Sequence, residues 1–539
     1  MTPEITWQAI GEVLFHQSQV APSNVAVTAP DRRPLTYARL AAHVESVVGS
    51  LNSMGLGRNH RVAIVLPNGP EMATAFLSVS SAATCAPLNP TYGRSEFDFY
   101  LSDLNARALL ILSGIDSPAT EVAQNRRIPI IELVPDLEGG AGLFTLTGQK
   151  QSAPSSPNFA QPDDVALVLH TSGTTSRPKI VPLTHRNLCV SALNIRNTYE
   201  LSSNDRCLNV MPLFHIHGLV AAILSTMRSG SSVVCTPGFD DAKFFGWLDA
   251  FRPTWYTAVP TMHQAILQRA TANIDAVARH PLRFIRSCSA ALPPRVMVEL
   301  ERTFGVPVLE AYGMTEASHQ MCSNPLPPAE RKPGSVGVAT GPEVAIMDEL
   351  GNLVPACTTA EIVIRGSNVA AGYESNPEAN KISFTNGWFR TGDQGYLDGD
   401  GYLFITGRIK EIINRGGEKI TPREVDEVLL EHPAVAQAVT VAVPHTTLGE
   451  DVAAAVVLRE GAAVSEKELR EVAFDQLAGY KVPSQIVTVG EIPKGPTGKL
   501  QRIGLIEQLA SQLKAPFIAP RDGAEEALAR IWTEVLGIE

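Results

Sequence analysis

The 539-residue sequence predicts an α/β protein, with a large multi-layered N-terminal domain of mixed sheets and a small, mobile α+β C-terminal domain. Two observations support this class. Short apolar runs rich in β-branched residues, such as residues 61–66, alternate with helix-like stretches such as residues 71–83. Such alternation is typical of strands and helices that stack in layers. The length also exceeds what a single hydrophobic core usually holds, so two or more domains are expected.

Changes in composition indicate where the domains begin and end. Residues 149–162 are rich in Ser, Pro, Asn and Gln, which indicates a surface connection leading into an apolar strand at residues 165–169. After a compact charged segment around residue 410, shorter patterns follow, with a strand at 435–443 and a helix at 466–477. We therefore expect a large domain over residues 1–406 and a small domain over 411–513, joined by residues 407–410 and followed by a linker with the start of a further helix over 514–539.

The composition argues against several functional classes. A formal net charge of -11 does not supply the clustered Lys and Arg that nucleic-acid backbones require, so no nucleic-acid partner is expected. The 7 cysteines lack the paired spacing of metal sites and are interpreted as reduced thiols. No apolar run approaches the roughly 20 residues of a membrane span, and the first residues do not resemble a secretory signal. We expect a cytoplasmic protein with no membrane partner.

Residues 171–179 read TSGTTSRPK directly after the predicted strand at 165–169. Hydroxyl groups, a glycine and a terminal lysine are suited to contact phosphate oxygens. The segment is not a Walker A loop, which requires the spacing G-x-x-x-x-G-K-[ST]. Taken alone, the segment is better interpreted as a polar surface turn before a helix.

Six motifs follow one another in a fixed order: TSGTTSRPK, MPLFHIHGL, YGMTE, RTGD, GRIKEII and PTGK. Together they resemble the adenylate-forming superfamily of acyl-CoA synthetases, carrier-loading adenylation domains and luciferases, up to about residue 513. The stretches LHTSGTTSRPK, RFIRSCSAAL, EAYGMTEASH and INRGGEKI are most similar to oxalyl-CoA synthetases. Two positions depart from the wider family. Ser176 stands where Gly is common, and Ile180 replaces the Gly that usually follows the lysine, which reduces local backbone freedom.

The resemblance implies an acid–thiol ligase that uses ATP. A carboxylate would attack the α-phosphorus of ATP, and the acyl-adenylate would then pass its acyl group to a thiol of CoA or of phosphopantetheine. Such a site must neutralise two anions, bind Mg²⁺ and hold the reactants in line. The nucleotide-binding residues implied by the resemblance are Thr171, Ser172, Gly173, Thr174, Thr175, Glu310, Ala311, Tyr312, Gly313, Thr315, Asp393 and Arg408.

The resemblance also implies individual roles in adenylation. Tyr312 would stack on adenine, and Asp393 with Arg408 would bind the ribose. Glu316 would hold the magnesium ion, with the hydroxyl of Thr315 beside it. Thr171 and Lys179 would contact phosphate, and Lys499 would enter the site to stabilise the charge that develops during adenylation. Each residue also has a plainer interpretation, as a core aromatic, a helix cap, a turn former or a solvated surface charge.

Further residues are implied for the acid and for the thiol. His215, Ser289 and His319 are the polar candidates for acid binding, which favours a small, polar, oxalate-like acid. His215 would also gate the thiol tunnel, whereas His217, two residues later on a segment expected to be extended, is interpreted as structural. The resemblance also implies a hinge at residues 407–410, which Lys410 matches, so that the small domain would be mobile. Gly416 and Gly417 match a loop that approaches pantetheine, although two glycines also suit a simple turn.

The last part of the chain predicts a helix with apolar positions at three- and four-residue spacing, preceded by Asp522 and Glu525 in the pattern of a capping box. The segment APRDGAEEALARIWTEVLGIE resembles the linker and first helix of a carrier domain. A downstream carrier domain is therefore an expected partner, with an ordinary C-terminal helix as the alternative.

Two other functional classes compete with a thioester-forming ligase. A luciferase-type enzyme would make the same adenylate and then consume oxygen. A non-catalytic nucleotide-binding relative would lack the reaction altogether, which the presence of Lys499, Glu316 and Asp393 disfavours. A ligase for aromatic or medium-chain acids is the alternative within the leading class.

Overall fold

The computed structural model describes residues 7–150, 152, 154, 156–171, 178–495, 500, 502, 505, 520 and 522–536. The expected phosphate-loop residues Ser172, Gly173, Thr174, Thr175 and Ser176, together with Lys499, lie outside the described residues. The chain divides into two compact units. The N-terminal unit comprises Met1–Thr391 and Tyr396–Phe404, and the C-terminal unit comprises Gly392–Gly395 and Ile405–Glu539. The domain boundaries and the hinge expected from the sequence stay predictions.

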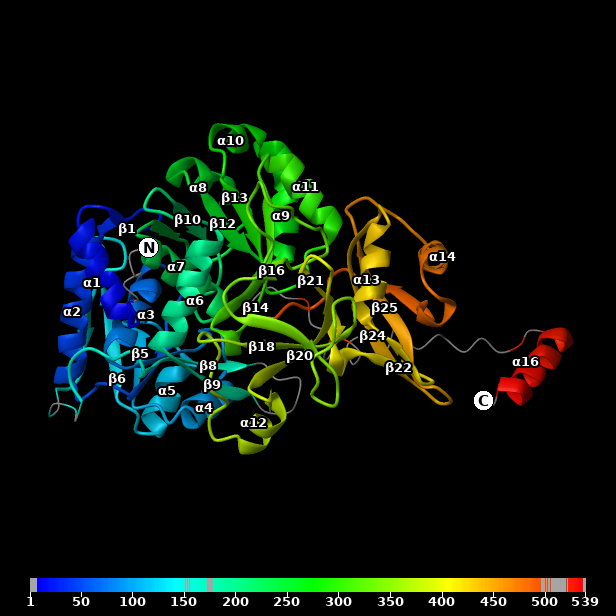
Figure 1. Cartoon of the computed structure of the whole chain (residues 1–539), viewed down its shortest axis with the longest axis horizontal. Coiled ribbons are helices and arrows are strands. Elements are labelled where there is room, and N and C mark those ends of the chain that lie inside the picture. The colour runs from blue at the N-terminus through cyan, green and yellow to red at the C-terminus, as the bar shows by residue number, and fades with distance from the viewer. Residues whose placement is uncertain are drawn as a thin grey trace. The chain divides into compact units, whose positions relative to one another are not determined.

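The described residues of the N-terminal unit contain two large sheets (Figure 1). Sheet A has the order β16 (Val338–Ala339), β15 (His319–Ser323), β14 (Val308–Met314), β13 (Phe284–Ser287), β12 (Trp255–Ala258), β10 (Arg206–Asn209), β11 (Ser232–Cys235), β1 (Val25–Thr28) and β2 (Leu35–Thr36). Sheet B has the order β7 (Phe144–Thr147), β6 (Ile130–Pro135), β5 (Ala108–Leu112), β3 (Arg61–Val65), β4 (Thr84–Pro87), β8 (Val165–Thr171) and β9 (Lys179–Thr184). Both sheets are mixed, because antiparallel edge strands flank parallel central ones.

A smaller sheet and two groups of helices complete this part of the fold. Sheet C has the order β17 (Glu343–Met347), β18 (Ala360–Arg365), β20 (Trp388–Leu397) and β19 (Phe384–Thr385), with β21 (Leu403–Arg408) paired to β20. Outer helices are α4 (Arg94–Asp103) and α5 (Pro118–Asn125) beside sheet B, and α8 (Phe244–Phe251), α9 (Pro260–Ala270), α10 (Ile274–Arg279) and α11 (Pro294–Phe304) beside sheet A (Figure 1). The other helices are α1 (Ile10–Val20), α2 (Tyr37–Ser53), α3 (Pro70–Ala82), α6 (His185–Thr198), α7 (Ser225–Ser229) and α12 (Pro377–Ser383).

The arrangement follows from the apolar pattern. The expected strand at 61–66 is β3, and the expected helix at 71–83 is α3, which begins at Pro70 and is buried along its whole length. A proline at the first helical position is favourable because its missing N–H has no intrahelical partner there. Helices α8 to α11 pack on β10, β12 and β13 through one apolar core, which includes Tyr256, Ile285 and Leu300. The expected α/β class with mixed sheets and a smaller C-terminal unit is therefore confirmed.

The C-terminal unit is built around sheet D, whose order is β23 (Glu418–Ile420), β22 (Ile413–Arg415), β25 (Gly449–Leu458) and β24 (Val435–His445), with β26 (Gln485–Thr488) paired to β25. Helices α13 (Pro422–Glu431) and α14 (Glu466–Gln476) share one apolar core with this sheet. Both the strand and the helix expected here, at 435–443 and 466–477, are present as β24 and α14.

A partly buried ion cluster holds Arg502 against α13 and η4 (Ile409–Glu411) in this unit. Arg502 donates to Asp426 at 2.6 Å and to Glu411 at 3.1 Å, and it also donates to the carbonyl of Thr440. Burial raises the pKa of Asp426, while Arg502 acts in the opposite direction. Leu500 pairs with Lys494 as an isolated β-bridge. Chain positions on both sides of residues 496–499 are thus fixed within the C-terminal unit.

Three buried histidines of the N-terminal unit make its stability depend on pH. Burial lowers the pKa of His43 and of His185 to about 4, and that of His263 to about 3. Because these folded-state values lie below the unfolded value of about 6.5, protons bind preferentially to the unfolded chain. The stabilisation is complete above about pH 6.5 and is lost as the pH falls toward about 4.

We expect the free energy of unfolding to fall by about 1.4 kcal/mol per histidine between about pH 7.5 and about pH 5.5. Urea unfolding followed by tryptophan fluorescence at both values measures this change. His43→Phe is the matched variant, since the ring of His43 already packs edge-on against Phe144 at 4.4 Å. That variant should lose about one histidine's share of the pH dependence. Equal stability of the wild type at both pH values contradicts the prediction.

Candidate active site

Several of the predicted site residues of the N-terminal unit follow the carboxyl ends of neighbouring strands in sheet A. Strands β10, β12, β13 and β14 are mutually parallel. His215 follows β10, Ser289 follows β13, and Glu316 follows β14. Ligands of open α/β sheets bind at the carboxyl ends of parallel strands, because the connecting loops gather there. The fold therefore brings residues distant in sequence to one edge of the sheet.

Strand β14 carries the predicted adenine-side residues Glu310, Ala311, Tyr312 and Gly313. Tyr312 is buried, and the pairing with β15 shifts register between Tyr312 and Gly313. A Cβ at Gly313 would lie 2.1 Å from the carbonyl oxygen of His319. Only glycine fits at this close approach, so the YGMTE motif has a packing reason for its second residue. The carboxylate of Glu310 accepts the backbone N–H of Leu292 at 2.8 Å.

Glu316 is held in place by a tyrosine that the sequence patterns did not single out. It lies in a short 3-10 turn, Thr315–Ala317, with a side chain that is mostly buried. Tyr373 donates its hydroxyl to Glu316 Oε1 at 2.6 Å. Burial, followed by the negative charge of Glu316, raises the pKa of Tyr373, so the phenol stays protonated and donates. Lys179 Nζ lies 4.3 Å from the centroid of the same ring.

The two ends of the TSGTTSRPK segment are paired with each other. Thr171 ends β8, Lys179 begins β9, and the two residues face each other in an antiparallel ladder. Ile180, the departure from the family pattern, lies in the regular part of this ladder and packs in the apolar core beside β3 and α4. Its backbone therefore needs no glycine at this position.

The segment around His215 and His217 differs from the extended conformation expected. His215 lies in a bend, and His217 begins a π-helix, η1 (His217–Leu224), so the expectation is wrong. The apolar run HGLVAAIL is buried on all sides, which favours a helix over a half-buried strand. His215 is half-buried, and its Nδ1 accepts the backbone N–H of His217 at 3.2 Å. Wide turns of this kind are frequent at functional sites.

A buried polar cluster joins two of the three predicted acid-binding residues. His217 Nδ1 lies 3.0 Å from Ser289 Oγ, and the rings of His217 and His319 are 5.0 Å apart. Between them lies Arg286 on β13, whose side chain is fully buried. Ser289 and His319 have positive φ angles of 76° and 106°, a strained conformation for residues with a Cβ. Strain of this kind collects at functional sites.

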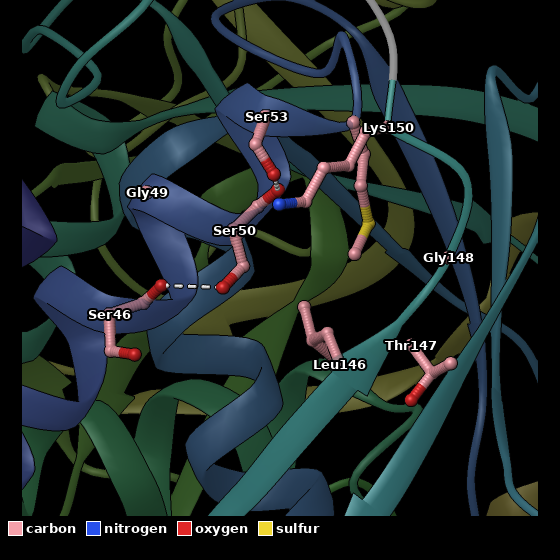
Figure 2. Close-up of a pocket in the computed structure, with 9 residues that line it drawn as sticks. Ser46, Gly49, Ser50, Ser53, Leu146, Thr147, Gly148 and Lys150 are labelled. Carbon is pink, nitrogen blue, oxygen red and sulfur yellow. Dashed lines mark hydrogen bonds between the residues drawn. The ribbon is translucent and has the colours of Figure 1, made fainter.

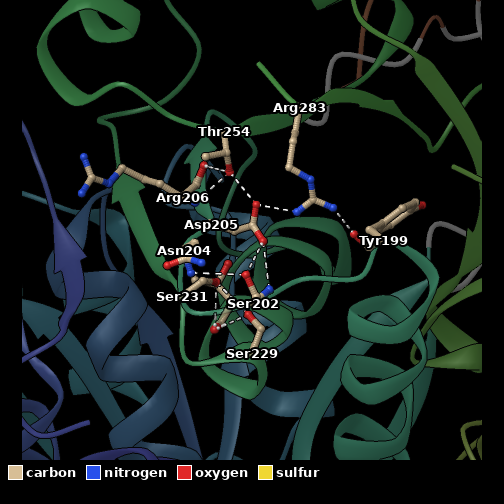
Figure 3. Close-up of polar contacts among 10 residues, drawn as sticks. Tyr199, Ser202, Asn204, Asp205, Arg206, Ser229, Ser231, Thr254 and Arg283 are labelled. Carbon is tan, nitrogen blue, oxygen red and sulfur yellow. Dashed lines mark hydrogen bonds and ion pairs between the residues drawn. The ribbon is translucent and has the colours of Figure 1, made fainter. Parts of the chain in front are cut away.

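Figure 3 shows a second polar network, which reaches the backbone of Tyr199. Arg283 forms an ion pair with Asp205 at 2.6 Å and also donates to the carbonyl of Tyr199. Asp205 accepts from the hydroxyl of Thr254 at 2.9 Å. Since Tyr199 OH in turn accepts from Arg286 at 2.9 Å, this network fixes one wall of the cluster.

The predicted ribose residues belong to the C-terminal unit and lie together. Arg408 Nε forms an ion pair with Asp393 Oδ1 at 3.3 Å. Lys410, the predicted hinge residue, is exposed in a short 3-10 turn, η4 (Ile409–Glu411). Gly416 and Gly417 form the turn between β22 and β23, with φ angles of 60° and 101°. Two consecutive positive φ angles are typical of a type I′ hairpin turn and explain this glycine pair.

The predicted C-terminal helix is present as α16 (Gly523–Leu536). Asp522 Oδ1 accepts from the backbone N–H groups of Ala524 and Glu525, which is the expected N-cap. Leu528, Ile531 and Trp532 are 50%, 52% and 59% exposed, so this apolar face lies largely in solvent.

Two surface clefts of the N-terminal unit contain none of the predicted site residues. Figure 2 shows one of about 460 Å³ between α2 and β7, where Ser46, Ser50, Ser53 and Lys150 supply polar groups. Among the residues that the structure describes, no three His, Cys, Asp or Glu side chains gather as a metal site. None of the described helices is both long and apolar enough to cross a membrane. All seven cysteines are free thiols.

Three residues of the site escaped the sequence interpretation. Arg286 lies in the quoted stretch RFIRSCSAAL, and the signal for it was a charged residue inside an otherwise apolar strand. Tyr373 lies in AGYESNPE, outside every motif that was considered. His217 was considered and interpreted as structural, yet it contacts Ser289, Thr257 and Arg286 directly.

Comparison with known proteins places the chain in a family. The profile described as AMP-binding enzyme matches residues 14–374, and the profile described as AMP-binding enzyme C-terminal domain matches residues 424–499. An oxalate–CoA ligase from Arabidopsis thaliana is 46% identical over 495 residues, covering 89% of this chain and 96% of that protein. A sulfoacetate–CoA ligase from Cupriavidus necator is 36% identical over 492 residues, covering 90% of this chain and 95% of that protein.

A solved structure agrees with these relatives. The crystal structure of ATP-bound MatB from Rhodopseudomonas palustris matches with a TM-score of 0.83 at 28% identity, covering 94% of this chain and 100% of that one. The resemblance to the adenylate-forming superfamily is thereby confirmed, and the chain belongs to the AMP-binding enzyme family.

Proposed function

We propose that this chain is an ATP-dependent acid–thiol ligase that activates a small dianionic acid, with oxalate as the leading candidate, and transfers its acyl group to CoA. The identity to an oxalate–CoA ligase supports the reaction class. The observation that carries the choice of acid is the buried polar cluster of Arg286, His217, Ser289 and His319. An apolar acid would offer no acceptor to the hydroxyl hydrogen of Ser289 and no anion to the buried charge of Arg286, which disfavours it strongly.

In the first step, a carboxylate oxygen of the acid attacks the α-phosphorus of ATP. The new O–P bond forms as the bond to the β-phosphate oxygen breaks, and pyrophosphate leaves with both electrons of that bond. The chain's contribution is to position the two anions and to balance the developing charge. We assign phosphate contacts to Thr171, Lys179 and the loop residues Ser172, Gly173, Thr174 and Thr175, with Thr315 beside them.

A magnesium ion would neutralise phosphate charge in this step. Glu316 suits it, because Mg²⁺ is typically bound through one or two carboxylates together with substrate phosphates. The hydrogen bond from Tyr373 fixes the direction of this carboxylate, and the adjacent Lys179 is suited to the same phosphates. We assign the adenine contact to Tyr312 with Glu310, Ala311 and Gly313, and the ribose contacts to Asp393 and Arg408. The ion pair between Asp393 and Arg408 supports a shared ligand for these two residues.

In the second step, a thiolate sulfur attacks the acyl carbon of the adenylate. The C–S bond forms, the bond from carbon to the phosphate oxygen breaks, and AMP leaves. We assign pantetheine binding to the Gly416–Gly417 turn, where the lack of side chains lets a backbone approach a thin ligand. Lys410 is the proposed hinge of the small domain, and half-buried His215 the proposed gate between acid and thiol.

The thiol acceptor has a second candidate. The exposed apolar face of α16 supports a carrier domain that follows this helix and bears phosphopantetheine, in place of free CoA. We place either reaction in the cytoplasm, which the free thiols of the chain support.

Pyrophosphate release across a panel of acids tests the proposal. We expect oxalate to exceed acetate, a medium-chain fatty acid and an aromatic acid by at least about 100-fold in kcat/KM. CoA and a phosphopantetheine-bearing carrier protein are then supplied separately, and oxygen uptake is recorded. Preference for a fatty or aromatic acid would contradict the choice of acid, and oxygen uptake without a thioester would favour the luciferase class.

A further inference from the structure

Arg286 is a buried cation without a carboxylate partner among the residues that the structure describes. Its side chain is 0% exposed, and none of the ion pairs of the described residues includes it. Burying an unpaired charge is costly unless hydrogen bonds or a counter-ion compensate. A permanent positive charge at this edge of sheet A therefore favours an anion that arrives with a ligand.

Every N–H of this guanidinium already has an acceptor within the protein. Nε donates to Tyr199 OH at 2.9 Å, and Nη1 faces Thr257 Oγ1 at 3.1 Å and His217 Nε2 at 3.2 Å. Nη2 faces Gln320 Oε1 at 3.0 Å and His319 Nδ1 at 3.4 Å. A guanidinium has five N–H donors, so all are used, and Arg286 acts on a ligand through its neighbours.

These contacts determine which ring nitrogen of each histidine carries the proton. A guanidinium donates and never accepts, so His217 Nε2 and His319 Nδ1 must be acceptors. The hydroxyl of Thr257, 2.6 Å from the same Nε2 of His217, is a second donor to it. A doubly protonated ring would point an N–H at another N–H, so the neutral form is favoured. The proton of His217 therefore lies on Nδ1, and that of His319 lies on Nε2.

The tautomer of His217 in turn determines what Ser289 can offer. Nδ1–H of His217 donates to Ser289 Oγ at 3.0 Å. A hydroxyl has one hydrogen, and Ser289 uses its oxygen as the acceptor for His217, so the hydrogen can be donated elsewhere. Ser289 is half-buried at the carboxyl end of β13, where the acid is proposed to bind. The chain from Arg286 through His217 thus ends in a directed donor at the acid site.

We propose that Arg286 is a positioning residue that selects dianionic acids. It fixes the ring protons of His217 and His319, so that Ser289 presents its hydroxyl hydrogen to the second anionic group of the acid. This inference rests on the proposed function, since it names the part of the acid site that recognises the group not activated by ATP. An acid with a methyl group in that place would leave the donor unpaired and gain nothing from the buried charge.

The first test compares substrates in the full-length chain. In Arg286→Met, we expect KM for oxalate to rise about 100-fold, with kcat for pyrophosphate release and KM for ATP within about threefold. The ratio of kcat/KM for oxalate over acetate should fall by a similar factor. Arg279→Met is the matched control, because it removes an exposed guanidinium at the end of α10, where Arg279 pairs with Asp249 and contacts no residue of the cluster. It should leave KM for oxalate within about threefold.

Two results of this comparison overturn the inference. One is a Met variant that loses oxalate and acetate activity in the same proportion. The other is a loss confined to kcat. Arg286→Lys keeps the positive charge but lacks the five N–H donors of the planar guanidinium. This variant tests the inference if the Met variant does not fold. We expect it to raise KM for oxalate about tenfold, and an unchanged KM would also overturn the inference.

The second test measures the tautomers and is independent of activity. Histidine is labelled with ¹⁵N, and the His217 signals are assigned by their loss in His217→Gln. The ring nitrogen shifts of the wild type should show a proton on Nδ1 of His217 and on Nε2 of His319, with the His217 pattern altered in Arg286→Lys. A proton on Nε2 of His217 in the wild type overturns the role of Arg286. If the wild type activates no dianionic acid, the proposed function fails, and the ring shifts alone decide this inference.

Discussion

Lys499→Ala is expected to lower ATP–pyrophosphate exchange by about 100- to 1,000-fold, because adenylation would lose the cation that balances charge at the α-phosphate. In the sequence, Lys499 stands between Lys494 and Leu500, which pair as a β-bridge of the C-terminal unit, and three residues before Arg502 of the ion cluster. A lysine of a mobile C-terminal unit would act only in adenylation, the step for which it is proposed to enter the acid site. Thioester formation from a chemically prepared acyl-adenylate should therefore change by less than about threefold.

Lys494→Ala is the matched control for this prediction. Lys494 lies at the other end of the same short segment and forms a long ion pair with Glu491 at 3.9 Å. A long, partly exposed ion pair contributes little to the stability of the fold, so ATP–pyrophosphate exchange should stay within about twofold of the wild type. Near-normal exchange in Lys499→Ala, or equal loss in both variants, would show that Lys499 has no special role.

The second large effect is expected at Glu316. Glu316→Gln keeps the shape of the side chain but removes the negative charge, so we expect kcat for pyrophosphate release to fall about 100-fold. The magnesium concentration that gives half-maximal rate should rise together with this loss. Tyr373→Phe removes only the hydrogen bond that orients the carboxylate, and a drop of about three- to tenfold is expected.

Steady-state kinetics over a magnesium titration distinguish a metal ligand from a packing residue. Glu378→Gln, on the exposed surface of α12, is the control and should match the wild type. If Glu316→Gln loses rate without any change in its magnesium dependence, the assignment of Glu316 to the metal is wrong. Circular dichroism of each variant checks that the N-terminal unit still folds.

The fold class and the individual elements could be read from local patterns. The apolar run of strand β3 is followed by the apolar pattern of helix α3, which starts at a proline. Helix α14 has a complete capping box, formed by Ser465 and Glu468. These signals depend only on residues close together in the sequence, so they can be recognised without knowledge of the tertiary structure.

The acid site could be predicted only in part, because its contacts join residues far apart in the sequence. Ser289 and His319 were found through motifs. The only sequence signal of Arg286 was its charge in an apolar strand, and its role became visible only with its acceptors on β12, β15 and η1. His217 was assigned to an extended segment, and an extended segment would have placed it on the same face as His215. The π-helix gives it a different direction and joins it to Ser289.

The π-helix η1 also affects how the specificity of this polar cluster can evolve. A π-turn holds one residue more than an α-turn, so loss of a single codon within residues 218–224 would leave a helix of ordinary pitch. Each residue of an α-helix advances by about 100° around the axis, so the deletion would turn His217 away relative to the rest of the helix. We therefore expect a one-codon deletion in this helix to change which acid the enzyme prefers, although every side chain of the polar cluster would still be present in the sequence.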